Sequence, residues 1–397
     1  MLEKVHLPFL VTLMLSLNGI RFRFYGDIYL GEVFALIYLI LRIFLPKQSV
    51  RTKLEKQAIR YLIIWIITLL FSSLFHGAGF TNTINSFGAA IITLALYLFL
   101  IEFIFPRYGF EKVFCTILVG QILAAFAQPY NYGLSNGWKY QYGLAVCILV
   151  IFVSESLLKQ RLLIYLLIIP LVYISLQRET RSLAGFLVLS LILSVVLNIE
   201  RPQKLRIRTY IALAVSTIGI FALYLVLAQQ EILGEQELVR SNRLLGSPLK
   251  LFSGRLEIFY TLPTFLKNPF LGYGADLNIE QSHLDYINNW IASRGIASPR
   301  DIYPTSEIPI HSYLFSSLLT GGIMAGLFWF FVVRIAVGEI TNLSYSKIKY
   351  RTTSNFIAIS LIWNVLFSPW GAASRIIAAI SIVYLTRDIS KKSINPE

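Results

Sequence analysis

Long apolar stretches recur along almost the whole chain, and they limit it to a fold that crosses a membrane many times. A membrane-spanning helix needs about 20 largely apolar residues, and about twelve segments approach that length. They cover residues 7–20, 28–45, 58–75, 86–105, 111–128, 141–157, 162–177, 182–199, 208–228, 311–334, 354–368 and 372–387. Of the 397 residues, 56% are hydrophobic and 14% are charged. We therefore expect an all-α integral membrane protein.

The basic residues fall in alternate turns between these segments. They cluster in residues 47–60, 201–208 and 347–351, whereas the turns in between hold few lysines or arginines. Because cytoplasmic loops of membrane proteins carry an excess of Lys and Arg, this pattern predicts that both chain termini lie in the cytoplasm. The same pattern accounts for the net charge of +14, so we do not expect nucleic acid as a partner.

One long segment, residues 229–310, interrupts the succession of apolar stretches on the outer side. It divides the chain into residues 1–228 with spanning segments one to nine, the extracytoplasmic loop itself, and residues 311–397 with the last three spanning segments and a cytoplasmic tail. A loop of this length in a compact protein is usually functional or has its own structure. We treat the three parts as one integrated domain.

The loop contains two predicted helices. Ser253 can cap a helix with apolar residues at helical spacing, and this helix should end near Lys267 because Asn268-Pro269 follows. Residues 281–293 fit a second, amphipathic helix that lies on the membrane surface. The apolar side of that helix, which we expect to face lipid, consists of Leu284, Ile287, Trp290 and Ile291.

Three residues on the predicted outer side could carry chemistry. Arg181 opens the eighth apolar segment, Arg255 falls in the first turn of the loop helix, and His311 begins the tenth segment. Arginines kept near the bilayer on the non-cytoplasmic side suggest a bound anion, and a helix N-terminus adds amide donors to such a site. A helix N-terminus also keeps an imidazole neutral, which suits a general base.

Each of these residues also has a plainer interpretation. Arg181 can extend to the membrane interface without binding anything, Arg255 can pair with Glu257, and His311 can be an interfacial histidine with a satisfied hydrogen bond. Arg178 and Arg375 lie on the same side and are further candidates for phosphate contact, with the same alternative.

Other kinds of site find no support in the sequence. It contains no phosphate-binding loop of the P-loop type, no nucleophile elbow, no paired-cysteine zinc pattern and no carboxylate cluster with metal spacing. We therefore expect no metal and no cofactor. His76, in the Gly-rich turn His76-Gly77-Ala78-Gly79, is a weaker candidate that could line a cavity.

Three local patterns follow one another in a particular order. The first is Thr180-Arg181-Ser182-Leu183. The second is Ser253-Gly254-Arg255, continued by Asn268-Pro269 and Gly272-Tyr273-Gly274. The third is His311-Ser312-Tyr313-Leu314, followed by Gly321-Gly322. Over about residues 175–335, these patterns resemble the O-antigen ligase/polymerase superfamily of bacterial envelope glycan transferases.

The resemblance implies a GT-C-like membrane glycosyltransferase in the bacterial inner membrane, with its active site on the periplasmic face. Such enzymes transfer a glycan from undecaprenyl pyrophosphate to an acceptor sugar hydroxyl, without a metal. The residues matching Arg181 and Arg255 contact the pyrophosphate, and the residue matching His311 acts as the general base. The implied partners are the lipid-linked oligosaccharide, an acceptor glycan or glycolipid, the lipid bilayer and a chain-length regulator.

Two activities share this site plan. Family ligases that act on lipid A-core often carry His-x-His-Asn at the third pattern, whereas this chain has Pro309-Ile310-His311-Ser312. The difference favours a surface polysaccharide or O-antigen polymerase over an O-antigen ligase. A flippase for lipid-linked glycans is an alternative of another class, but it should show internal repeats and charges at mid-membrane. The nearest such charges are Glu102 and Glu155. A non-catalytic assembly or sensor protein is a further alternative.

Overall fold

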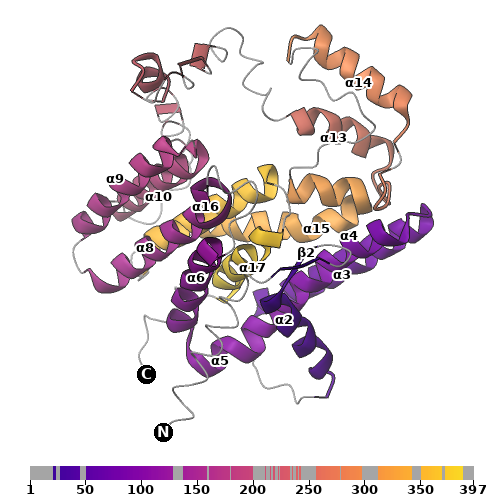
Figure 1. Cartoon of the computed structure of the whole chain (residues 1–397), viewed down its shortest axis with the longest axis horizontal. Coiled ribbons are helices and arrows are strands. Elements are labelled where there is room, and N and C mark those ends of the chain that lie inside the picture. Colours follow the sequence, from indigo (N-terminus) through magenta and orange to yellow (C-terminus); the bar gives the residue numbers. More distant parts are fainter. Residues whose placement is uncertain are drawn as a thin grey trace.

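The computed structural model of the protein describes residues 21–23, 27–44, 51–127, 137–158, 161–178, 180–199, 256–277, 279–296, 312–341, 350–368 and 372–387, together with scattered positions between 211 and 242. This part is almost entirely helical (Figure 1). The elements up to residue 127 are β1 (Arg21–Arg23), β2 (Asp27–Tyr29), α2 (Leu30–Leu41), α3 (Lys53–Phe75), α4 (Phe80–Leu98), the π-helix η2 (Phe99–Ile104), α5 (Phe105–Tyr108) and α6 (Phe110–Ala127). The later elements are the π-helix η3 (Trp138–Tyr142), α8 (Gly143–Leu157), α9 (Arg161–Gln177), α10 (Arg181–Ile199), α13 (Leu256–Lys267), α14 (Gln281–Ser293), α15 (Tyr313–Thr341), α16 (Arg351–Phe367) and α17 (Ala372–Thr386).

The predicted apolar segments are helices wherever the structure describes them continuously. Segment 7–20 lies outside the described residues, and segment 208–228 is described only at scattered positions. The second segment, expected over 28–45, begins as a helix only at Leu30. The residues just before it form β2, which pairs antiparallel with β1. This short hairpin is the exception to an otherwise all-α fold among the described residues.

Three helical segments are long and apolar enough to cross a membrane. They are Lys53–Phe75, the continuous run Phe80–Tyr108 through α4, η2 and α5, and Tyr313–Thr341. Shorter apolar helices include α2, α8 and much of α9, α10 and α17. The structure therefore supports a helical membrane protein, whereas the number of twelve spanning helices and the GT-C-like arrangement stay predictions.

The pairing of α3 with α15 forms the centre of the helical core. Trp65 of α3 stacks on Phe328 with ring centroids 5.4 Å apart and meets the edge of Trp329 at 5.3 Å. The indole of Trp329 donates a hydrogen bond at 2.9 Å to the hydroxyl of Ser317, which lies 12 residues earlier in α15. Large aromatic rings bury much apolar area, so the ring contacts of Trp65 hold the two long helices together.

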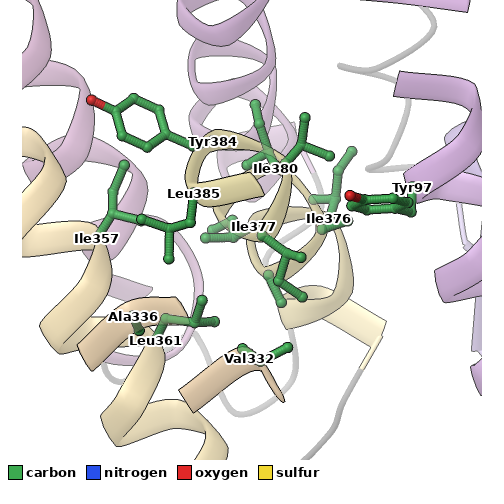
Figure 2. Close-up of a cluster of buried hydrophobic side chains, with 14 of the residues drawn as sticks. Tyr97, Val332, Ala336, Ile357, Leu361, Ile376, Ile377, Ile380, Tyr384 and Leu385 are labelled. Carbon is green, nitrogen blue, oxygen red and sulfur yellow. The ribbon is translucent and has the colours of Figure 1, made fainter. Parts of the chain in front are cut away.

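The last helix, α17, is the most enclosed element of the core. Its apolar residues, among them Ile376, Ile380 and Leu385, are buried on several sides by α4, α15 and α16 (Figure 2). One end of α17 is also fixed by polar contacts: Thr52, at the start of α3, donates to the carbonyl of Thr386, and the hydroxyls of Tyr97 and Thr386 lie 2.9 Å apart. These contacts join the start of α3 and the end of α4 to the end of α17.

The two acidic residues weighed as mid-membrane charges both have structural partners. Glu102, in η2, accepts hydrogen bonds from Tyr38, Arg42 and Arg51. Glu155 lies near the end of α8, and its carboxylate accepts the backbone N–H of Thr352 at 2.7 Å, at the beginning of α16. Buried charges are costly unless paired and hydrogen-bonded, and these pairings offset part of that cost.

The two predicted loop helices are present as α13 and α14, and they lie together at one corner of the molecule, away from α9 and α10 (Figure 1). The prediction that the apolar side of α14 faces lipid was wrong for three of its four residues. Leu284, Ile287 and Ile291 are buried in a cluster that also contains Leu256 and Tyr260 of α13. Because α13 is itself amphipathic, the two helices bury their apolar sides against each other. Trp290 is more exposed and packs beside Phe259.

Candidate functional site: the starts of α10, α13 and α15

Of the three residues predicted to carry the chemistry, Arg181 is the one that the structure describes. It occupies the first position of α10, directly after Thr180, whose carbonyl accepts the N–H of Ala184 at 3.1 Å and so starts the helix. The Arg181 side chain is half-buried, and its guanidinium lies 5.1 Å from the centre of the Tyr224 ring. A cation over an aromatic face is held in place by that contact, and the planar guanidinium donors match the geometry of phosphate oxygens.

Arg255 and His311 lie outside the described residues, but the residue after each one is described. Leu256, after Arg255, is buried and belongs to the same apolar cluster as Leu319 of α15. Ser312, after His311, is fully buried. Its hydroxyl donates to the carbonyl of Val365 at 2.9 Å and accepts the N–H of Phe315 at 3.1 Å, so Ser312 caps α15 and ties it to α16.

One end of α16 contacts residues near the beginnings of both α10 and α15. Trp363 of α16 packs on Phe186, five positions after Arg181, with ring centroids 5.5 Å apart. Two residues further along, the carbonyl of Val365 holds Ser312. In Figure 1, α16 lies between α10 and α15 accordingly. The neighbours of Arg181 and of His311 are therefore at the same end of one helix, although they are far apart in the sequence.

The second and third sequence patterns meet in space at a break in α15. Gly322 has φ 69° and ψ −164°, which is not helical, so α15 consists of a first half up to Gly321 and a second half from Ile323. The turn that contains Asn268-Pro269 and Gly272-Tyr273-Gly274 fills this break. Tyr273 and Gly274 donate their N–H groups to the carbonyls of Leu319 and Thr320, at 2.7 and 3.0 Å. In return, the N–H of Ile323 donates to the carbonyl of Pro269 at 2.7 Å.

A serine of α3 completes this junction. The hydroxyl of Ser72 lies 2.7 Å from the carbonyl oxygen of Thr320 and accepts the N–H of Gly274 at 3.1 Å. The side-chain amide of Asn268 closes the turn from within by donating to the carbonyl of Gly272. We call the turn 268–274, the break at Gly322 and Ser72 together the α15 junction.

The further arginine candidates have different environments. Arg178 is exposed at the end of α9. Arg375 is buried, and its guanidinium donates to both carboxylate oxygens of Glu32, at 2.7 and 2.8 Å. Glu32 therefore occupies the Nε/Nη2 edge of the Arg375 guanidinium, and its carboxylate is itself held by the N–H of Tyr29.

His76 lies where the α3–α4 turn meets the turn 268–274. Its Cβ is close to Gly274, so close that a Cβ on that glycine would lie 3.2 Å from it. Nearby, the carboxylate of Asp276 accepts the N–H of Gly79 at 2.6 Å and the side-chain amide of Asn82 at 2.7 Å. This turn therefore anchors the segment after α13 to α3 and α4.

A comparison with family models finds one match in this region. Residues 179–330 match the model described as O-Antigen ligase. The resemblance to the O-antigen ligase/polymerase superfamily is confirmed. No curated protein and no solved structure matches the chain.

The O-antigen ligase match covers α10, the turn 268–274 and the break at Gly322, and it leaves out Arg178, His76, Arg375 and the contacts made by α2, α3, α4 and α16. It includes Arg181, Arg255 and His311, both loop helices and the first part of α15. Sequence reasoning missed Ser72, because a single serine in an apolar helix gives no signal by itself. It also missed that Glu32 pairs with Arg375, since the two residues are separated by almost the whole chain.

Proposed function

We propose that this protein is a membrane glycosyltransferase of the O-antigen ligase/polymerase type. It would move a glycan from undecaprenyl pyrophosphate to the hydroxyl of an acceptor sugar, at the outer face of the bacterial inner membrane. The observation that carries the proposal is the position of Arg181 at the start of α10, beside the end of α16 that also holds Ser312. The family match supports it, because that match spans Arg181, Arg255 and His311.

In the proposed reaction, Arg181 and Arg255 bind the leaving group. As the bond between the anomeric carbon and the phosphate oxygen breaks, negative charge grows on the lipid diphosphate. Two guanidiniums can neutralise this charge in place of a metal ion, and their planar donors match phosphate oxygens. The half-buried Arg181, steadied by Tyr224, is suited to a phosphate at headgroup depth. Arg375 is left out of the proposed site because Glu32 already holds it.

The proposed general base is His311. It would remove the proton from the acceptor hydroxyl while that oxygen forms a bond to the anomeric carbon, and the lipid diphosphate leaves from the opposite side. A single displacement of this kind inverts the configuration at the anomeric carbon. The base would lie directly before Ser312, whose two hydrogen bonds fix the first turn of α15.

We favour polymerase as the specific activity, with O-antigen ligase as the second candidate. The position after His311, which is asparagine in the ligase pattern, is Ser312 here, and its side chain is used to cap α15 and to bind α16. It is therefore engaged in structure. The description of the matching family favours the ligase, so the acceptor has to be tested directly.

The test is an in vitro reaction of the purified, folded protein with an undecaprenyl-pyrophosphate oligosaccharide. A ladder of longer lipid-linked glycans identifies a polymerase, and transfer to added lipid A-core identifies a ligase. We expect His311→Ala to reduce the rate by about 10²–10⁴-fold and Arg181→Ala by about 10²–10³-fold. Arg334→Ala, which removes an exposed arginine of the second half of α15, is the matched control and should keep full activity.

Two outcomes would overturn the proposal. The first is the absence of turnover with either acceptor in preparations that remain folded. The second is full activity of both Arg181→Ala and His311→Ala. Movement of the lipid-linked glycan across vesicles without any new glycosidic bond would favour the flippase.

A further inference from the structure

The α15 junction contains backbone groups that the break at Gly322 removes from the helical pattern. In a continuous helix, the carbonyls of Leu319 and Thr320 would accept N–H groups from the next turn. Here the turn 268–274 and Ser72 supply the partners instead. Unpaired backbone groups cost several kcal/mol in a membrane interior, and irregular backbone is tolerated there only where protein satisfies it. The broken shape of α15 therefore depends on this junction.

Ser72 is the point where three separate parts of the chain meet. It belongs to α3, it is fully buried, and its hydroxyl contacts the carbonyls of Leu271 in the turn and Thr320 in α15, at 2.5 and 2.7 Å. The same oxygen accepts the N–H of Gly274. An alanine at this position would remove all three contacts at once while leaving the helical backbone of α3 intact.

The first half of α15, Tyr313–Gly321, is held at both ends. At its far end the α15 junction fixes its angle to the second half. At its near end Ser312 bonds to α16. Since this half is short and separated from the rest of α15 by non-helical backbone, its direction depends on these two attachments, together with the contacts of Tyr313 and Ser317 with Trp329. The residue directly before Ser312 is His311.

We propose that Ser72 is a positioning residue for the proposed base. By holding the α15 junction, it sets the direction of the first half of α15 and so the place from which His311 reaches the acceptor hydroxyl. This inference rests on the proposed function. A displacement of about 1 Å at a reacting group can cost about 10²-fold in rate, so a remote hydroxyl can matter to catalysis.

The experiment compares three variants of the full-length protein. Ser72→Ala removes the hydroxyl, Ser72→Thr retains it, and Ser73→Ala alters the neighbouring buried serine as a matched control. We expect Ser72→Ala to lower kcat about 10–100-fold with the KM for the lipid-linked donor unchanged, because the donor would still be bound but the base misplaced. Ser72→Thr should recover most of kcat, and Ser73→Ala should stay close to the unaltered protein.

A further variant tests whether misfolding explains the loss of kcat in Ser72→Ala. Asn268→Ala acts on the same junction from the turn, where its amide closes onto Gly272, and the residue is only half-buried. It should show the same loss of kcat in a milder form. Hydrogen–deuterium exchange should rise in residues 268–274 and 313–322 of both variants, and it should stay unchanged in α14.

The outcomes separate the two proposals. Unchanged kcat in Ser72→Ala, or a raised KM with unchanged kcat, would overturn the positioning role while leaving the transferase intact. If the unaltered protein has no transferase activity, the proposed function fails and the positioning role fails with it. In that case the exchange data would still report whether Ser72 holds the junction.

Discussion

Gly272 and Gly322 lie back to back, so close that neither position has room for a side chain. A Cβ on Gly272 would lie 2.5 Å from the carbonyl oxygen of Leu319 and 2.7 Å from the nitrogen of Gly322. A Cβ on Gly322 would overlap the carbonyl of Phe270. Both glycines also have positive φ, 68° and 69°. This contact joins the turn 268–274 to the tenth predicted spanning segment.

Replacing either glycine by alanine should destabilise the protein. Positive φ costs a residue with a Cβ about 1–3 kcal/mol, and overpacking adds about 1–3 kcal/mol. We therefore expect Gly272→Ala and Gly322→Ala to lower the free energy of unfolding by at least about 2 kcal/mol. Thermal unfolding in detergent measures the effect. Gly338→Ala, in the same helix with open space around it, is the control and should change little.

The buried pair of Arg375 and Glu32 predicts a stability defect. Removing one partner of a buried ion pair leaves the other charge unpaired and typically costs about 3–5 kcal/mol. Glu32→Ala and Arg375→Ala should each show a loss of this size in thermal unfolding. The double variant Glu32→Met with Arg375→Leu should recover much of it, because no charge then remains buried. A defect in activity without a defect in stability would return Arg375 to the list of phosphate ligands.

His283 predicts a pH-dependent packing of α13 on α14. Its Nε2 lies 3.3 Å from the hydroxyl of Thr264, which already donates to the carbonyl of Tyr260, so His283 is the donor of the contact. Burial, helped by the charge of Lys267, lowers the pKa of His283 below its ordinary value of 6.5. The neutral ring is therefore the form that the folded packing favours.

The sign of the effect follows from linkage. Because the folded pKa lies below the unfolded one, the stabilisation is complete above pH 6.5 and is lost as the pH falls through the folded pKa. Hydrogen exchange in α13 and α14, corrected for intrinsic rates, should increase as the pH is lowered from about 7.5 to about 5. His283→Gln should remove this pH dependence. An equal change in α14 of both proteins would contradict the assignment to His283.

Glu155 predicts a local effect at the beginning of α16. Its carboxylate accepts the N–H groups of Thr352 and Thr353, at 2.7 and 2.9 Å, in the first turn of that helix. Loss of a helix cap costs about 0.5–2 kcal/mol. Glu155→Ala should therefore increase hydrogen exchange in residues 352–354, and Glu155→Gln should do so less. Exchange in α13, which is remote from this contact, serves as the internal reference.

Much of the helical layout was predictable because it depends on local composition. Apolar runs of helical length marked α10 to within one residue, and the spacing within 281–293 marked α14. The helices α3 and α4 begin five and six residues before their predicted segments, and α15 ends seven residues after its segment. The partner of the apolar side of α14 was not predictable in the same way. Lipid and a second amphipathic helix satisfy the same apolar pattern, and only the fold shows that α13 takes this place.

By itself, the sequence determined the membrane class, the helical segments and the family pattern with Arg181, Arg255 and His311, because each is encoded in residues close together along the chain. The tertiary structure alone decided that Glu32 holds Arg375, that Ser72 joins the turn 268–274 to a broken helix, and that one end of α16 gathers the starts of α10 and α15. The physical reason is that buried charges and unpaired backbone groups must find partners wherever packing brings them, and sequence distance does not limit that choice.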